Sequence, residues 1–318
     1  MFIALALIVG GLVVLAFGAD VLVRGASSLA LLARIRASIV GLTVVAAGTS
    51  LPELVVSMKS ALVGSPDLAL GNVVGSNIFN LTVVLGFAAL LRPLRVLAST
   101  VRMEAPVMVL AAFQLHLLAR DGLIDRPEGA FLTMGWLLFV VYMVHVAKRE
   151  SGLAEEQEFA DELRPPVGQG LRGWLLSLGW VALGVLLLVG GSEALVRGAV
   201  SIARLAGVSE RVVGLTIVAA GTSLPELATS AVASWRGHDD IAVANVVGSN
   251  IFNSLAIVGL TSVVHPLGVN PLLVMRDNPW MLVLSVLVVP LFRAGMRVNR
   301  IEGALLVASF VAYLTLLL

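Results

Sequence analysis

Residues 41–54 read GLTVVAAGTSLPEL, and residues 214–227 read GLTIVAAGTSLPEL, so the two segments are identical at thirteen of fourteen positions. Each segment carries one glutamate, Glu53 or Glu226, in otherwise uncharged sequence. Repetition of an acid in such a setting indicates a duplicated chain whose halves keep a carboxylate at equivalent positions.

A second pair of segments recurs at the same offset of 173 residues. Residues 71–80 read GNVVGSNIFN, and residues 244–253 read ANVVGSNIFN. Generic membrane helices need only be apolar, so duplication this selective predicts a site that both halves build together.

The composition predicts an integral membrane protein. Hydrophobic residues make up 58% of the chain and charged residues 13%, whereas soluble domains carry about 25% charged residues. The net charge of +1 gives no reason to expect nucleic-acid binding, and the absence of cysteine excludes disulfides, thiolate zinc sites and cysteine nucleophiles. The apolar run from Phe2 has no Lys or Arg before Arg24, which is unlike a cleavable signal peptide, so we expect it to be the first span.

Turn and charge clusters divide the chain into ten segments, each long enough to span a bilayer with roughly 20 apolar residues. The expected spans are residues 3–31, 38–63, 68–91, 102–119, 127–146, 174–203, 211–235, 241–264, 273–292 and 301–318. Five spans per half is an odd number, so the second half must enter the membrane from the opposite side. We therefore predict an all-α membrane protein of ten helices in two inverted five-helix repeats, with helices 2 and 7 broken at the core.

The predicted repeats are residues 1–146 and 173–318, and residues 147–172 form a charged linker with no room for a folded domain. An outside N-terminus would place 14 of the 21 Lys and Arg residues, with the linker, in the cytoplasm. This positive-inside bias predicts a multi-pass cell (plasma or inner) membrane protein with both termini extracytoplasmic.

The two repeated glutamates are predicted to be functional. Each lies about halfway along its span, where a charge costs between about 2.5 and more than 10 kcal/mol unless it finds a partner, a proton or water. A structural ion pair would need a nearby cation, and neither span carries a Lys or Arg within one turn of its glutamate, the nearest being Lys59 and Arg236.

Proline and glycine beside each glutamate predict a break in the helix. Pro52 and Pro225 lack a backbone donor, and Gly48 and Gly221 loosen the preceding turn, so nearby carbonyls should be partly freed. The oxygen-bearing residues at these breaks are Ala46, Thr49, Ser50 and Glu53, and Ala219, Thr222, Ser223 and Glu226. A set of oxygens without His or Cys suits hard cations such as Na⁺ and Ca²⁺.

Spans 3 and 8 each carry a polar stripe at i, i+4, i+8. Its members are Asn72, Ser76 and Asn80, and Asn245, Ser249 and Asn253. Such residues can join helices through hydrogen bonds where glycines permit close packing. We favour packing for Asn77 and Asn250, which lie off the stripe, and cation ligation or site lining for Ser76, Asn80, Ser249 and Asn253.

The paired GTSLPEL and GSNIFN blocks resemble the two alpha repeats of the cation/calcium antiporter superfamily, in particular the prokaryotic sodium/calcium exchangers, over the whole chain. The resemblance implies cation sites between spans 2, 3, 7 and 8, with spans 1 and 6 sliding as a gating pair. By family pattern, the ligands would be Ala46, Thr49, Ser50, Glu53, Ser76, Asn80, Ala219, Thr222, Ser223, Glu226, Ser249 and Asn253.

One position departs from the family pattern. Many relatives place an aspartate in the second repeat where this chain has Asn253, so the site carries two formal negative charges. Two carboxylates balance one Ca²⁺ or two Na⁺, which leaves the coupling ratio open. Potassium co-transport in the family is associated with that aspartate, which disfavours potassium dependence here.

Several other charged residues have ordinary explanations. The pairs Asp20 with Arg24 and Glu193 with Arg197 read as helix-end ion pairs at equivalent places, with a gating role as the alternative. The acids that begin spans 3 and 8 (Asp67, Asp239 and Asp240) read as helix caps, with an entry funnel as the alternative. The four histidines (His116, His145, His238 and His265) do not recur at the repeat offset and read as loop or interfacial residues.

The sequence therefore predicts an antiporter, not an enzyme, that exchanges Ca²⁺ for Na⁺ by alternating access. Both ions are transported substrates, no cofactor or obligate protein partner is inferred, and a monomer should function. A Ca²⁺/H⁺ exchanger is the nearest alternative, because a buried glutamate can carry a proton. A cation channel is an alternative of another class, although channels usually assemble rings of identical subunits.

Overall fold

The computed structural model describes residues 1–150, 170–205 and 219–317, and most of these residues lie in helices. Within this part of the chain, seven helices are long and apolar enough to cross a membrane, or up to eight if the bent pair Ala37–Thr49 and Leu51–Leu62 is one span. The fold is therefore that of a helical integral membrane protein, as predicted.

The elements follow one another in two series, in which η marks short π-helical or 3₁₀ segments. The first series is α1 (Phe2–Ala33), α2 (Ala37–Val40), η1 (Gly41–Val45), α3 (Ala46–Thr49), α4 (Leu51–Leu62), α5 (Pro66–Phe79), η2 (Asn80–Val84), α6 (Leu85–Leu91), β1 (Leu94–Arg95), η3 (Thr100–Glu104), α7 (Ala105–Leu118), η4 (Ala119–Asp121), β2 (Leu123–Ile124) and α8 (Arg126–Glu150). The second is α10 (Gly170–Leu205), α12 (Ala219–Thr222), α13 (Leu224–Arg236), α14 (Asp239–Ile251), η6 (Phe252–Ile257), α15 (Val258–Val264), β3 (Leu267–Gly268), η7 (Leu273–Asp277), α16 (Asn278–Arg293), β4 (Arg297–Val298) and α17 (Arg300–Leu317).

The predicted spans coincide with these helices to within a few residues wherever both are described. Residues 211–218 of the seventh predicted span, and most of the predicted linker 147–172, lie outside the described residues. At the edges of that linker the helices run further than predicted, because α8 continues to Glu150 and α10 already begins at Gly170.

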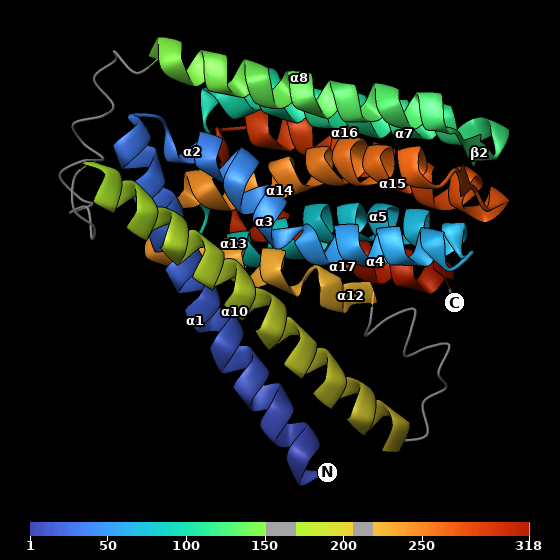
Figure 1. Cartoon of the computed structure of the whole chain (residues 1–318), viewed down its shortest axis with the longest axis horizontal. Coiled ribbons are helices and arrows are strands. Elements are labelled where there is room, and N and C mark those ends of the chain that lie inside the picture. Colours follow the sequence, from blue (N-terminus) through green and yellow to red (C-terminus); the bar gives the residue numbers. More distant parts are fainter. Residues whose placement is uncertain (151–169, 206–218, 318) are drawn as a thin grey trace.

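The long helices α1 and α10 lie side by side and cross the remaining helices obliquely (Figure 1). The segment α14–η6–α15 (Asp239–Val264) lies at the centre of the bundle, and its most apolar 18-residue window is entirely buried, against 28% for the corresponding window of α1. A polar side chain on the central segment is therefore shielded from both lipid and water by the other helices.

Two small antiparallel strand pairs connect the first and second series. Leu94 pairs with Val298 where β1 meets β4, and Ile124 pairs with Leu267 where β2 meets β3. The β1–β4 pair adjoins the start of α14, since the backbone N–H of Arg95 donates to Asp239 (3.1 Å), whereas β3 follows the end of α15. The two halves are therefore joined at opposite ends of the central segment.

Glycines at seven-residue spacing form the interface between α1 and α10. They are Gly11, Gly18 and Gly25 on α1, and Gly184, Gly191 and Gly198 on α10. A Cβ atom on Gly11 would lie 2.7 Å from the backbone nitrogen of Leu195, and one on Gly184 would lie 2.7 Å from Cα of Leu22. Small residues allow membrane helices to pack at such short range. The spacing, repeated at the 173-residue offset, was visible in the sequence but was not used in the prediction.

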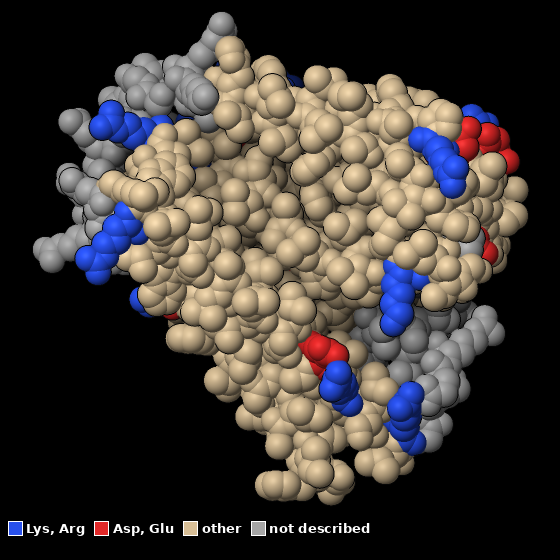
Figure 2. Space-filling model, viewed as in Figure 1, with Lys and Arg blue, Asp and Glu red and all other residues tan. Residues whose placement is uncertain are grey.

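The surface agrees with a lipid environment. Large apolar side chains are widely exposed, among them Leu12 (54%), Phe131 (57%) and Leu186 (70%). Figure 2 shows charged side chains toward the margins of one face, with a broad uncharged surface between them. An exposed apolar surface of this extent is what a bilayer requires and what water would disfavour.

The glycine interface yields a matched pair of substitutions. Gly11→Ala should lower the apparent melting temperature of the detergent-solubilised protein, because its Cβ meets the backbone of α10 and overpacking costs about 1–3 kcal/mol. Gly10→Ala is the control, since no atom lies within 4 Å of its Cβ. Both variants gain the same helix propensity, so equal melting temperatures would contradict the close packing described here.

Candidate cation-binding site

Each half contains a helix that breaks beside its glutamate. Helix α3 ends at Thr49 and α4 begins at Leu51, with Ser50 outside helical geometry at φ −86° and ψ 10°, and the axis bends by 44°. Ser223 has the same conformation at φ −90° and ψ 8° between α12 and α13. Pro52 and Pro225 occupy the second position of the new helix, where a missing N–H costs nothing.

The breaks place each glutamate against a serine of the other half. Ser50 Oγ donates a hydrogen bond to Glu226 Oε1 (2.6 Å), and Ser223 Oγ donates to Glu53 Oε1 (2.9 Å). All four residues are 0% exposed. The two carboxylates predicted from residues 173 positions apart therefore share one buried site.

Two asparagines brace the glutamate-bearing helices in the same way. Asn72 Nδ2 donates to the carbonyl oxygen of Glu53 (3.3 Å) and to Ser57 Oγ (3.0 Å). In the second half, Asn245 Nδ2 donates to the carbonyl of Glu226 (3.4 Å) and to Ser230 Oγ (3.0 Å). The asparagines of the polar stripes thus hold the helix behind each carboxylate.

Threonines at the breaks connect the two braces. Thr49 Oγ1 donates to Asn245 Oδ1 (3.2 Å), and Thr222 Oγ1 donates to Asn72 Oδ1 (3.4 Å). Each brace therefore joins both halves, and the site is a closed set of reciprocal bonds. Asn72 and Asn245 belong to the polar stripes of the sequence, but their bracing contacts were not predicted. The bracing partners Ser57 and Ser230 were not predicted either. Their signal was recurrence at the repeat offset, four residues after each glutamate.

Several buried oxygens at the site have no hydrogen-bond partner within the described part of the chain. They are Glu53 Oε2, Glu226 Oε2, Asn80 Oδ1, Asn253 Oδ1 and Ser249 Oγ. Ser76 Oγ lies within hydrogen-bond distance of Ser223 Oγ (3.0 Å) and so joins the same cluster. Buried polar atoms normally have partners, so unpaired oxygens contributed by both halves fit a bound cation or its water.

Asn80 and Asn253 lie in widened helical turns. Asn80 is the first residue of the π-helical segment η2, and Asn253 lies in the π-helical segment η6. Such turns often occur at functional sites. Both side chains are 0% exposed, which agrees with a place inside the site.

One carbonyl oxygen at each break is already hydrogen-bonded. The carbonyl of Ala46 accepts a hydrogen bond from the backbone N–H of Ser50 (3.0 Å) and lies 3.3 Å from Thr49 Oγ1, so it is partly occupied. In the second half, Ala219 begins α12, and the carbonyl of Gly221 accepts from Ser192 Oγ of α10 (2.5 Å). Ser192 has alanine at the equivalent position in the first half, so the repeat gave no signal for it.

The site holds two acids and no compensating base among the described residues. Asp20, Glu193 and Asp277 form ion pairs among the described residues, and none of these pairs includes Glu53 or Glu226. Two buried carboxylates without cationic partners are strongly disfavoured in an apolar interior. The arrangement can therefore hold cations or protons, and its oxygen ligands suit hard cations.

The remaining candidates lie outside this cluster. Asn77 donates to Ser254 Oγ of the other half (2.8 Å), as its predicted packing role requires, whereas Asn250 donates to the carbonyl of Val246 on its own helix (3.1 Å). Asp239 accepts the backbone N–H of Arg95 (3.1 Å) and thereby joins the two halves.

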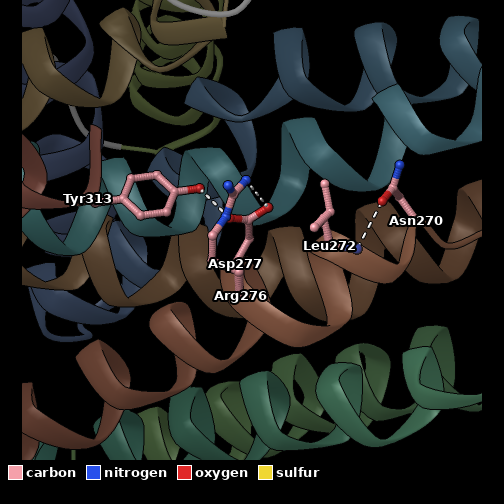
Figure 3. Close-up of polar contacts among 5 residues, drawn as sticks. All are labelled: Asn270, Leu272, Arg276, Asp277 and Tyr313. Carbon is pink, nitrogen blue, oxygen red and sulfur yellow. Dashed lines mark hydrogen bonds and ion pairs between the residues drawn. The ribbon is translucent and has the colours of Figure 1, made fainter. Parts of the chain in front are cut away.

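The predicted pairs Asp20 with Arg24 (3.0 Å) and Glu193 with Arg197 (2.5 Å) both form. A third acid, Asp277, was not considered in the sequence analysis. It accepts hydrogen bonds from Nε of the adjacent residue Arg276 (2.8 Å) and from the hydroxyl of Tyr313 on α17 (3.1 Å) (Figure 3).

Comparison with known proteins decides the family. The model of the family described as "Sodium/calcium exchanger protein" matches residues 3–145 and 176–318, which is most of the chain. The chain belongs to this family. This match confirms the resemblance that the repeated GTSLPEL and GSNIFN segments indicated.

Relatives of similar length include "Putative antiporter CaxA" of Alkalimonas amylolytica, which is 40% identical and covers 100% of this chain and 99% of its own. "Inner membrane protein YrbG" of Escherichia coli is 37% identical, with 100% and 97% covered. "Sodium/calcium exchanger MaX1" of Methanosarcina acetivorans is 28% identical, with 96% of each chain covered.

Among solved structures, the sodium-calcium exchanger NCX_Mj soaked without Na⁺ and Ca²⁺ has a TM-score of 0.85 and 26% identity, covering 100% of this chain and 99% of that one. The same protein soaked with Na⁺ alone has a TM-score of 0.82 and 28% identity, covering 99% and 98%. The exchanger family and this fold agree in supporting cation/calcium exchange.

The bracing asparagines can be tested apart from the carboxylates. Asn245→Ala removes two donated bonds and one accepted bond, so it should cost about 1–3 kcal/mol of stability and reduce the thermal shift that Ca²⁺ produces. Asn270→Ala is the control, because Asn270 is exposed and its side chain accepts a single hydrogen bond among the described residues, from the backbone N–H of Leu272 (2.9 Å; Figure 3). An undiminished Ca²⁺ shift in Asn245→Ala would exclude the bracing role.

Proposed function

We propose that the protein is a secondary antiporter that exchanges Ca²⁺ for Na⁺ by alternating access at one site shared by its two halves. The observation that carries the proposal is the pair of buried carboxylates, Glu53 and Glu226, each bonded by a serine of the other half and neither compensated by a base among the described residues. Membership of the exchanger family supports the same chemistry.

The proposed ligands are the twelve residues that the family pattern indicated: Ala46, Thr49, Ser50, Glu53, Ser76, Asn80, Ala219, Thr222, Ser223, Glu226, Ser249 and Asn253. The unpaired carboxylate, amide and hydroxyl oxygens support the central members most directly. The carbonyl of Ala46 has less support, since it already accepts the backbone N–H of Ser50. With asparagine at position 253, two carboxylates balance one Ca²⁺ or two Na⁺, and potassium is not part of the proposed cycle.

The architecture proposed for this cycle is ten spans in two inverted repeats, residues 1–146 and 173–318, joined by a linker at residues 147–172. The family model matches the chain in two segments that correspond to these repeats. The reciprocal serine, asparagine and threonine bonds recur at the 173-residue offset and also support it. No second chain is needed to complete the site, so the proposed functional unit is a monomer without a cofactor.

Both termini are proposed to be extracytoplasmic, in a cell membrane. Arginines gather at the end of the bundle where β1 pairs with β4, with Arg92, Arg95, Arg297 and Arg300 in or beside these strands. The positive-inside rule would make this end cytoplasmic, and a relative is named an inner membrane protein. A reporter enzyme that works only outside the cytoplasm should be active when fused to the C-terminus, and an inactive fusion would reverse the orientation.

Exchange requires that the unloaded site resist crossing between the two sides. Two uncompensated carboxylates in a closing apolar environment supply this resistance, and bound cations relieve it. Helix α10 passes close to both breaks, since a Cβ on Gly48 would lie 2.8 Å from Val185 and one on Gly221 would collide with Val196. A shift of the paired helices α1 and α10 would therefore change access to the site directly.

Neutralising either glutamate tests the function. Glu53→Gln and Glu226→Gln keep the shape of the side chain but remove the charge, and each should abolish Na⁺-driven uptake of radiolabelled Ca²⁺ into vesicles. Glu302→Gln is the control, because Glu302 is at a helix start and its carboxylate accepts the backbone N–H of Asn299 (2.7 Å). Normal uptake in either site variant would refute the assignment.

A Ca²⁺/H⁺ exchanger is the second candidate, because a buried carboxylate can carry a proton and the name of the relative CaxA does not specify the ion exchanged. The hydroxyls beside each glutamate favour Na⁺, since proton carriage does not need them. Ca²⁺ uptake driven by a pH gradient in the complete absence of Na⁺ would identify the protein as a Ca²⁺/H⁺ exchanger. Single-channel currents in a planar bilayer would instead show that the protein is a cation channel.

A further inference from the structure

One acid on α1 connects that helix to the end of α13. Asp20 is 16% exposed and pairs with Arg24 on its own helix (3.0 Å). It also pairs with Arg236, the last residue of α13. Arg236 belongs to the helix that begins beside Glu226, so the contact joins α1 to a helix of the proposed cation site.

The second half lacks the equivalent contact. Glu193 on α10 corresponds to Asp20, and it pairs with Arg197 of its own helix, where the two side chains are 59% and 70% exposed. The position equivalent to Arg236 is Val63, which is 67% exposed and has no charge to offer. An ion pair of this kind is therefore possible at one end of the site only, although the site itself is nearly symmetric.

The position of α1 makes this contact mechanically relevant. Helix α1 packs along α10 through the glycine interface, and the pair lies obliquely beside the other helices (Figure 1). The helix exposes much of its outer surface, so it has fewer buried contacts with the bundle than the central segment has. A movement of α1 away from α13 at this end must separate Asp20 from Arg236.

Arg24 determines how costly that separation is. An acid left alone near the apolar interior would be strongly disfavoured. Asp20 keeps Arg24 as a partner on the same helix, so its charge stays compensated when Arg236 leaves. Arg236, at a helix end and 39% exposed in its side chain, can reach water. The contact can therefore form and break without stranding a buried charge.

We propose that Asp20 and Arg236 form a one-sided latch that holds α1 against α13 at the arginine-rich end and so stabilises the conformation in which these two residues are paired. The proposal rests on the alternating-access function. It assigns a conformational bias to one end of the carrier that the symmetric cation site cannot supply.

The absence of cysteine from the chain permits a direct test. Ser27 lies two turns after Asp20 on α1 and is 4% exposed, so Ser27→Cys introduces one protected thiol. Its reaction rate with a small water-soluble thiol reagent is measured in purified protein without Na⁺ or Ca²⁺. Arg236→Gln and Asp20→Asn should each raise this rate by about five-fold or more, the lower end of typical couplings between two states.

Two further variants separate the latch from a general loss of structure. Arg236→Lys keeps the charge and should react as slowly as the protein with Ser27→Cys alone. Glu193→Gln removes the equivalent acid of α10 and should also leave the rate unchanged. A monodisperse elution profile checks that each variant is folded.

Unchanged rates in both Arg236→Gln and Asp20→Asn would overturn the latch, as would an equal rise in Glu193→Gln. The labelling needs no transported ion, so it is independent of the exchange assay. Faster labelling of the latch variants of a protein that does not exchange Ca²⁺ for Na⁺ would support the latch and refute the proposed function. Normal exchange of Ca²⁺ for Na⁺ with unchanged labelling rates in the latch variants would support the function and refute the latch.

Discussion

The structure depends on two buried carboxylates that neither half of the chain can accommodate alone. Glu53 receives its hydrogen bond from Ser223, and Glu226 receives its bond from Ser50. Because acids with the same charge repel one another in an apolar interior, this proximity is tolerated only where oxygens and a mobile positive charge can share the site. Each serine lies at the break of its helix, three residues before the glutamate of its own half. Helix breakage and reciprocal bonding are therefore consequences of one constraint, and the proposed cation binding follows from the same constraint.

A second set of bonds keeps the broken helices in register. Asn72 and Asn245 each hold the carbonyl of a glutamate, and a threonine of the opposite half bonds to each asparagine. Freed backbone groups at a break need partners wherever neither lipid nor water can supply them. Side-chain amides supply both a donor and an acceptor, which explains why asparagine occupies these places. The same network transmits a change at one break to the opposite half.

Departures from symmetry occur at the site, where Ser76 contacts Ser223 while the equivalent Ser249 has no hydrogen-bond partner among the described residues, and in its surroundings. Ser192 bonds to the carbonyl of Gly221, while the first half has alanine at that place. Asp20 bonds to α13, while Glu193 remains on its own helix. An alternating carrier needs a site that is similar from both sides, but the two closed conformations need not be equally stable. The asymmetry of the outer contacts can set this balance without altering the ligands.

The sequence by itself determined the membrane class, the approximate positions of the described helices, the helix breaks and the identity of the two acids, because composition, proline and duplication act locally or repeat along the chain. It could not show that Asn72 and Asn245 brace the helices, that the carbonyl of Ala46 is already bonded, or that Asp20 reaches Arg236. Those facts depend on which helix faces meet and at what distance. Only the tertiary structure decided them, because side chains far apart in the chain become partners through packing, and apolar periodicity does not specify the partner of a packed face.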